Sequence, residues 1–235
     1  MFETDAAVFA RAVPADVRGN LLEASFVPAD PTPHSIFFLY MRLNSDGTFE
    51  ARQYYHHGND DPIDPSPDNP TNPNTLGYYV KDMALNARKE GSAYPVHGYG
   101  VDINFPQRFS YCVYFMDDLH WRFLTEGNHL PVVYFKTRKN GQIYKDHPHA
   151  FRRLPLVEME MPNRWTTVGK DIRQAAVMIN RMHDEHGVRL GDGVRERFCF
   201  EFPMRVRYGS TTDGLTLIID PTGTNLGPPE PPPAV

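Results

Sequence analysis

Two histidines separated by one proline form the pattern in this chain with the clearest chemical potential. His147-Pro148-His149 follows Gly141 after five residues. In an extended chain, residues two apart project to the same side, so the two imidazoles could bind one divalent metal ion. The spacing therefore makes His147 and His149 the candidate metal ligands, and a divalent metal is the one cofactor that the sequence suggests.

The spacing of Gly141, His147 and His149 resembles the start of the metal motif of the cupins, a family of small β-barrels. In that family two such histidines, a following glutamate and a later histidine hold iron, manganese or another divalent ion. Here Arg153 and Leu154 occupy the positions where the family places its glutamate, and nine residues carry the resemblance. The resemblance implies a cupin-like metal-dependent enzyme centred on His147 and His149. A surface turn after a hairpin is the competing interpretation.

Arginines recur on one side of an alternating stretch near the end of the chain. Between Arg195 and Tyr208, aromatic and aliphatic residues alternate with polar ones, and Arg195, Arg197, Arg205 and Arg207 fall on the polar side. Paired guanidinium donors suit phosphate, carboxylate or an acidic partner. The four arginines are therefore a candidate surface for an anion or a partner, and a solvated strand face that discourages aggregation is the alternative.

These candidate residues need a scaffold, and the periodicity of residues 166–187 predicts its longest helix. Apolar residues and two histidines recur there at intervals of three and four, namely Val168, Ile172, Ala175, Ala176, Ile179, Met182, His183 and His186. We predict an amphipathic helix at about 166–186 that covers a sheet. The two histidines fit the rim of its buried face better than a metal site.

Most of the remaining chain has strand patterns, with a second helix predicted at about 76–90. Asn44-Ser45-Asp46-Gly47 predicts a hairpin turn between two strands. The fold class expected is mainly β (α+β), an antiparallel β-sandwich or jelly-roll-like domain that carries the two helices. An open α+β sheet with both helices on one face is the alternative.

Proline is concentrated in two segments of the chain. Residues 57–74 are rich in Pro, Asn and Asp and predict a long loop. Residues 221–235 contain the run Pro228-Pro229-Glu230-Pro231-Pro232-Pro233, which is typical of an extended polyproline tail. We expect a single β-rich domain at 1–220 followed by this tail.

Composition narrows the classes of partner. The 235 residues include 24 basic and 29 acidic side chains, and the formal net charge of −5 argues against nucleic acid as a partner. No apolar run is long enough to span a membrane. The first fourteen residues lack the pattern of a signal peptide, and Cys112 and Cys199 form no disulfide framework. The expected location is the cytoplasm.

The sequence favours a non-catalytic binding or assembly subunit over an enzyme. The chain has exposed-edge strands, a long loop and a proline-rich tail, all features that contact a protein partner or a second copy. It lacks a coherent catalytic set. The first alternative is the cupin-like enzyme at His147 and His149, and the second is a module that binds an anionic small molecule on the arginine face.

Overall fold

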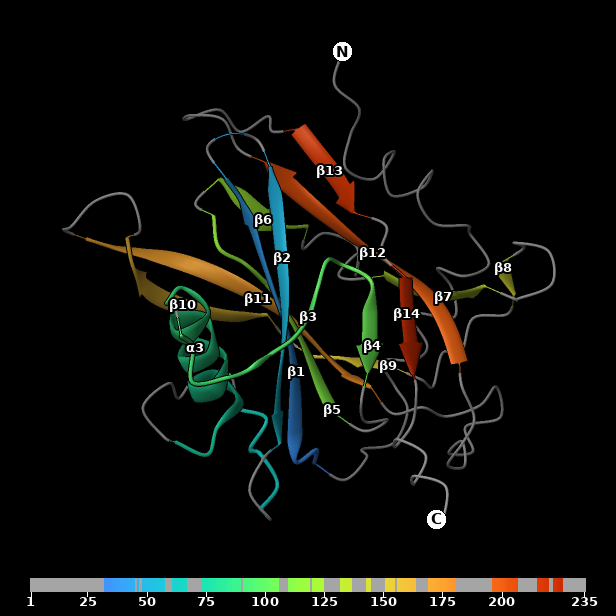
Figure 1. Ribbon diagram of the computed structural model, residues 1–235, viewed down its shortest axis with the longest axis horizontal. Helices are drawn as coiled ribbons and strands as arrows, with labels where there is room; N and C mark the ends of the chain where they lie inside the picture. Colours follow the sequence, from blue (N-terminus) through green and yellow to red (C-terminus); the bar gives the residue numbers. More distant parts are fainter. Residues whose placement is uncertain are drawn as a thin grey trace, which may run out of the picture.

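The computed structural model of the chain describes residues 32–44, 46, 48–57, 61–66, 73–89, 91–105, 110–118, 120–124, 132–136, 143–144, 151–154, 156–163, 169–180, 196–206, 215–219 and 222–225. This part of the chain is mainly β, with two sheets and one helix (Figure 1). The mainly β class expected from the sequence is confirmed.

The first sheet is mixed and open. Its strands run in the order β10 (Val157–Pro162), β11 (Lys170–Asn180), β5 (Ser110–Met116), β1 (Ser35–Leu43), β2 (Phe49–His57) and β3 (Val96–Tyr99), and β9 (Phe151–Arg153) also pairs with β11. β1 and β5 are parallel, while the other neighbouring strands are antiparallel. β1 and β2 form the predicted hairpin, in which the backbone N–H of Asn44 donates to the carbonyl of Thr48 at 2.8 Å.

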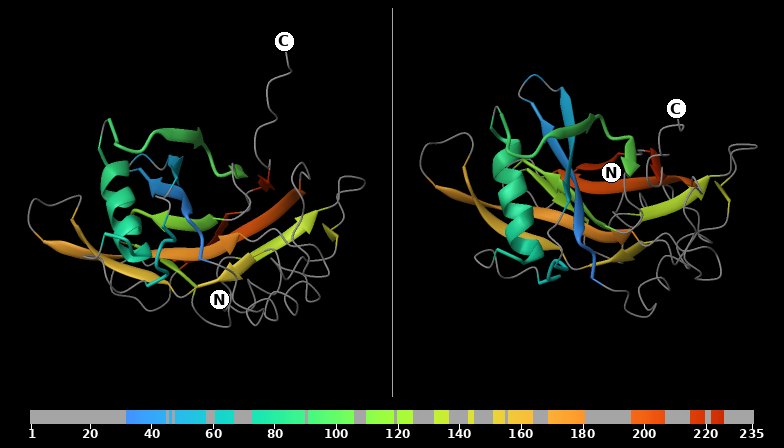
Figure 2. Two further views of the ribbon diagram at one scale, coloured as in Figure 1. Left: turned by 90° about the horizontal axis from the view of Figure 1, so that it is seen from below. Right: turned by 60° about the horizontal axis from the view of Figure 1, so that its bottom comes forward.

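The second sheet is organised around one long strand, β12 (Glu196–Val206). Four strands pair directly with β12, and β4 and β8 extend the sheet through β14 and β7. These strands are β4 (Ile103–Phe105), β6 (Trp121–Phe123), β7 (Val132–Lys136), β8 (Ile143–Tyr144), β13 (Leu215–Ile219) and β14 (Thr222–Asn225). α3 and the ends of β10 and β11 lie toward one end of the described part of the chain, and β7 and β8 lie toward the other (Figure 2).

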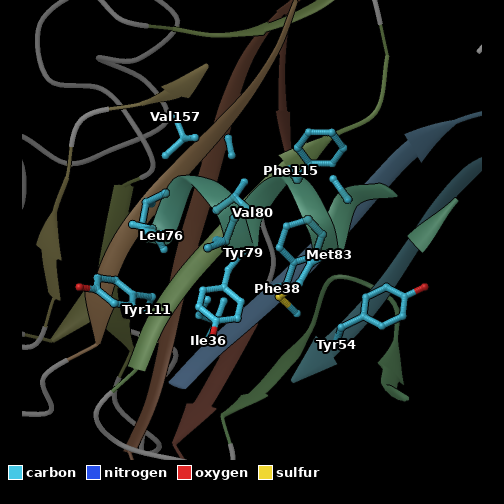
Figure 3. Packing of buried hydrophobic residues seen from close by; sticks show 14 of the residues in the cluster. Ile36, Phe38, Tyr54, Leu76, Tyr79, Val80, Met83, Tyr111, Phe115 and Val157 are labelled. Carbon is cyan, nitrogen blue, oxygen red and sulfur yellow. The ribbon is translucent and has the colours of Figure 1, made fainter. Parts of the chain in front are cut away.

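The helix predicted at about 76–90 is confirmed as α3 (Leu76–Ala87), the one helix in the described part of the chain. It begins at Thr75, whose side chain accepts a hydrogen bond from the backbone N–H of Tyr78 at 3.3 Å, as an N-cap residue does. Leu76, Val80 and Met83 lie on its buried side and pack against Ile36 and Phe38 of β1 (Figure 3).

The central strands of the first sheet are buried on both faces. Alternate residues of β1 belong to different cores, so Ile36 and Phe38 face α3 while Phe37 and Leu39 face the other way. On the side away from α3, the core includes residues of the second sheet, namely Ile103, Trp121, Phe123 and Met204. The first sheet therefore lies between the helix and the second sheet.

The predicted long helix at about 166–186 is wrong in its described part, because Lys170–Asn180 forms strand β11. β11 lies between β10 and β5, and all its residues from Ala175 to Asn180 are buried. A strand buried on both faces shows no alternation of apolar and polar residues, so its apolar run matches a helical period equally well. Pairing with β5, where Val177 lies opposite Val113, makes this segment a strand and not a helix.

The structure does not confirm the finer prediction of a sandwich or jelly roll, nor that of an open sheet with two helices on one face. The first sheet is open, since β10 and β3 stand at its two ends. Only α3, within the described ranges, covers a face of this sheet. What the structure supports is a mainly β fold with an open mixed sheet and one helix.

The described part of the predicted loop at 57–74 is anchored to the sheet. Ile63 is buried, its N–H donates to the carbonyl of Pro33 at 3.0 Å, and its carbonyl accepts from the hydroxyl of Tyr111 at 3.0 Å. In the segment assigned to the tail, Thr222–Asn225 forms β14, while 226–235 lie outside the described residues. The division into a 1–220 domain and a tail stays a prediction. Within the described ranges, no helix has the length and apolar character needed to cross a membrane.

Replacing Phe38 by Ala should destabilise the fold by about 3–5 kcal/mol, because the substitution opens a cavity in the core next to α3. Phe38 is fully buried, and its ring stacks on that of Phe115 with centroids 5.8 Å apart. Urea denaturation measures the change. The matched control is Phe49→Ala, in which a ring already 39% exposed is removed and the expected loss is about 1 kcal/mol or less. Equal losses in the two variants would contradict the assignment of Phe38 to the core.

Candidate functional site

A cavity of about 510 Å³ lies beside the carboxyl end of α3 and the β1–β2–β3 edge of the first sheet. Its walls include four basic side chains, Arg42, Arg52, Arg88 and Lys89, and one acidic one, Glu50. Its volume is in the range of about 300–1,000 Å³ that is typical of small-molecule sites. We treat this cavity as the candidate site.

The β1–β2 hairpin positions the first three charged groups. Arg42 and Glu50 are direct cross-strand partners, and Arg52 follows two residues later on β2, so its side chain projects to the same face as that of Glu50. Arg42 Nη2 lies 2.7 Å from Glu50 Oε2. Arg52 Nε lies 2.7 Å from Glu50 Oε1 without hydrogen-bond alignment, so this contact is an ion pair. The carboxylate of Glu50 thus forms ion pairs with the guanidiniums of both Arg42 and Arg52.

Arg52 also connects the hairpin to the end of α3. Its Nη2 donates to the carbonyl of Ala87 at 2.8 Å, one of the last carbonyls of the helix, which have no partner within the helix itself. Its guanidinium carbon lies 5.1 Å from the centroid of the Tyr40 ring, within the range of a cation–π contact. The guanidinium is therefore fixed from two sides.

Arg88 and Lys89 approach the cavity from the other side. Arg88 is the C-cap of α3, and Lys89 follows it. Arg88 Nε donates to Asp117 Oδ2 at 2.8 Å, its Nη2 donates to Asp117 Oδ1, and its Nη1 donates to the carbonyl of Pro162 at 2.8 Å. Cations are favoured at this end of a helix, where the macrodipole is negative.

The carboxylate of Asp117 is fully buried behind this wall of the cavity. It accepts a hydrogen bond from the hydroxyl of Tyr40 at 2.7 Å and lies 3.5 Å from Nε of the buried Arg173. Burial acts to raise the pKa of Asp117, but the hydrogen bonds of Arg88 and Tyr40 and the two nearby guanidiniums outweigh it and hold that pKa below its usual range. The charged form of Asp117 is therefore part of the fold.

The remaining wall consists of Tyr54 and the segment that follows α3, with Gly91, Ser92, Tyr94, Pro95 and Val96. Tyr94 lines the cavity, and its hydroxyl donates to Asp82 Oδ2 at 2.6 Å. The ring of His56 meets that of Tyr94 edge-on at 5.6 Å and lies 4.8 Å from the ring of Tyr79. Burial, together with the neighbouring His57, lowers the pKa of His56, so this imidazole is neutral at pH 7.

The cavity adjoins β3, an edge strand of the first sheet. β3 is the four-residue sequence Val96-His97-Gly98-Tyr99, which contains no Lys, Arg, Asp or Glu, and Tyr99 is 76% exposed. The opposite edge, β10, differs because its exposed residues Glu158 and Glu160 are charged. Charged residues at an edge discourage pairing with other chains, and β3 lacks them; it is short, and its register with β2 shifts between Gln53 and Tyr54.

The side chain of Gln53 fixes the position of β3. Its Nε2 donates to the carbonyls of Gly100 at 3.0 Å and Asp102 at 2.6 Å, and Gln53 is buried beneath the strand. A Cβ at Gly98 would lie 3.1 Å from Gln53 Oε1, closer than ordinary packing, so glycine suits this position. Gly100 has a φ of +84°, which favours glycine as well.

None of the candidate site residues predicted from the sequence is among the described residues that line the cavity. His147, His149, Arg195 and Arg207 lie outside the described residues, so the metal site stays a prediction. Arg197 and Arg205 lie in β12, where their backbones pair opposite Thr224 of β14 and opposite Thr216 of β13 and Arg122 of β6. Within the described ranges, no group of three or more His, Cys, Asp or Glu side chains is arranged to hold a metal ion.

The cavity residues are not predicted from the sequence, although two local signals for them are present. The predicted hairpin turn places Arg42 opposite Glu50, and the predicted helix ends at Arg88 and Lys89. Each pattern is ordinary when taken alone. Only the tertiary packing of α3 against the hairpin brings the four cations together.

Comparison with known proteins identifies no family. The chain matches none of the known protein-family models and none of the curated proteins. A crystal structure of an inclusion body protein, PixA, from Burkholderia cenocepacia J2315 is similar over 86% of this chain and 99% of that chain, with 8% sequence identity and a TM-score of 0.28. A similarity at that TM-score supports no conclusion about the fold or the function of this chain.

Replacing Asp117 by Asn should destabilise the protein by about 3–5 kcal/mol, because it leaves Arg173 and Arg88 with a neutral partner in a buried site. Urea denaturation at pH 7 measures the loss. The control is Glu160→Gln, which removes an ion pair to Lys170 in which both side chains are exposed, and it should cost less than about 1 kcal/mol. If the two variants lost the same stability, Asp117 would not have the role described.

The difference in unfolding free energy between wild type and Asp117→Asn should depend on pH. Because the folded-state pKa of Asp117 is depressed, its contribution to stability is present above the unfolded pKa near about 4 and is lost as the pH falls through the folded value. The difference in unfolding free energy between wild type and Asp117→Asn should therefore be constant above about pH 5 and shrink below about pH 4. Denaturation curves collected from pH 7 to pH 2.5 measure it. A difference that is unchanged across this range would contradict the ionised state of Asp117.

Proposed function

We propose that this chain is a non-catalytic binding or assembly protein that pairs through the β3 edge of its first sheet with the same edge of a second copy. One observation carries the proposal: β3 is an exposed edge without Lys, Arg, Asp or Glu, and it presents Val96 and Tyr99 to solvent. The backbone groups along such an edge can extend the sheet into another molecule.

A second copy is the partner that fits the sequence of β3 best. Val96 and Tyr99 lie opposite Tyr54 and Arg52 of β2, so the irregular register at His97 leaves them on one face of β3. In antiparallel pairing about a two-fold axis at Gly98, each Val96 then lies opposite the Tyr99 of the other copy. An aliphatic residue opposite an aromatic one is a favourable cross-strand pair. No formal charges oppose each other, and a two-fold contact closes on itself, so it gives a discrete dimer.

The predicted test is the oligomeric state of the Tyr99→Lys variant. Each lysine then lies opposite Val96 of the other copy, where pairing loses the favourable aromatic contact and removes water from the new charge, so the dimer dissociation constant should rise by at least about tenfold. Sedimentation velocity over a range of protein concentrations measures this constant. The control is Ile172→Lys, which places the same charge at another exposed apolar residue, 52% exposed on β11, and it should dimerise as the wild type does.

Three results would overturn the proposal. The first is a wild-type chain that stays monomeric at every concentration. The second is equal weakening by Tyr99→Lys and Ile172→Lys, which would show that added charge acts wherever it is placed. The third is dimerisation of Tyr99→Lys with wild-type affinity. Circular dichroism of both variants confirms that any loss of dimer does not result from unfolding.

A further inference from the structure

The cavity at the end of α3 has an excess of positive charge among its described residues. Arg42 and Arg52 share the single carboxylate of Glu50, and the charge of Arg88 is matched by Asp117 behind it. No described carboxylate lies within ion-pair distance of Lys89, which is exposed at the rim. Among the described residues, one cation of the arginine pair and Lys89 therefore have no matching carboxylate. Glu90, next in the sequence, lies outside the described residues.

We propose that this cavity binds a small doubly charged anion of the phosphate monoester class, held between Lys89 and the Arg42–Arg52 pair. A phosphate monoester carries a charge of about −1.5 to −2 at pH 7, close to the excess of positive charge. It also offers three acceptor oxygens. Lysine supplies a point charge and arginine a planar fork of donors, and both are suited to phosphate.

The rest of the cavity is suited to the organic part of such a molecule. Tyr94, Pro95 and Val96 line it with aromatic and apolar surface. Tyr54 lines it too: its ring belongs to the core, while its hydroxyl points away from the packed cluster (Figure 3) and has no hydrogen-bond partner. A buried hydroxyl without a partner is unusual and costly, so it is a free donor for a polar atom of the ligand after a small side-chain shift.

A purely structural role explains only some of these cations. Arg52 donates to Ala87, and Arg88 caps α3 and binds Asp117, so both stabilise the helix end without any ligand. Lys89 can stabilise the helix end through the helix dipole alone. The two accounts differ in what Lys89→Ala does. The structural account expects a small loss of stability and no change in phosphate affinity, whereas the binding account expects a loss of affinity.

The experiment is a titration of the full chain with phenyl phosphate and with inorganic phosphate at constant ionic strength, followed by calorimetry and by amide chemical shifts. Wild type should bind phenyl phosphate saturably, with a dissociation constant of about 1 mM or lower. Lys89→Ala should weaken binding by at least about tenfold. The matched control is Lys81→Ala, which removes the same charge from α3 two turns earlier, at a residue that does not line the cavity. It should bind within about twofold of wild type.

The proposal is overturned if wild type shows no saturable binding up to about 10 mM phenyl phosphate. Equal affinities of wild type and Lys89→Ala would also overturn it, as would equal losses in Lys89→Ala and Lys81→Ala, which would indicate a general effect of net charge. Succinate tests the class of ligand, since equal affinity for this dicarboxylate would contradict a phosphate site. Phosphate binding measured in wild type and in Tyr99→Lys separates the test of this proposal from the test of β3 pairing, because saturable binding by both proteins supports the anion site whatever their oligomeric state.

Discussion

The buried carboxylate of Asp117 is the interaction on which the arrangement of helix and sheet depends. It follows β5 directly, and its own N–H donates to Met41 of β1. Through Arg88 it holds the end of α3, and through Arg173 it reaches β11. A charge in this position is costly to bury unless it is paired. The elements that supply its partners must therefore assemble together, which couples the helix to three strands that are far apart in the sequence.

The parts of the fold that the sequence predicts are those set by local chemistry. The helix α3 has a capping residue, Thr75, and an apolar stripe that faces a single sheet, and the β1–β2 hairpin has its turn residues. β11 has no such local signal. Its apolar run is buried on both faces, and the spacing that imitates a helix results from residues that pack in two directions. Long-range pairing with β5 determines its structure, and no window of the sequence contains that information.

The candidate site depends even more on tertiary structure. Arg42 and Glu50 meet because a hairpin register is local, and Arg88 and Lys89 lie at a helix end that can be predicted. Their combination into one cavity depends on where α3 packs. The sequence instead suggests an anion or partner surface on arginines that alternate along one strand, because alternation is visible within a short window of residues. Of these, Arg197 and Arg205 lie in β12 of the second sheet, whereas the cavity residues come from the first sheet and α3.

Val96 belongs both to the wall of the cavity and to the start of the edge strand. Val96 is therefore common to both surfaces, and the segment that leads into it from Gly91 lines the cavity, so the conformation of this segment can enter the free energy of either binding event. Two equilibria that draw on the same segment are thermodynamically linked, and the linkage is reciprocal: a ligand that orders this segment changes the affinity of the edge by the same factor by which pairing changes the affinity for the ligand. An assembly built on this edge would respond to the concentration of a small molecule without any motion of the two sheets.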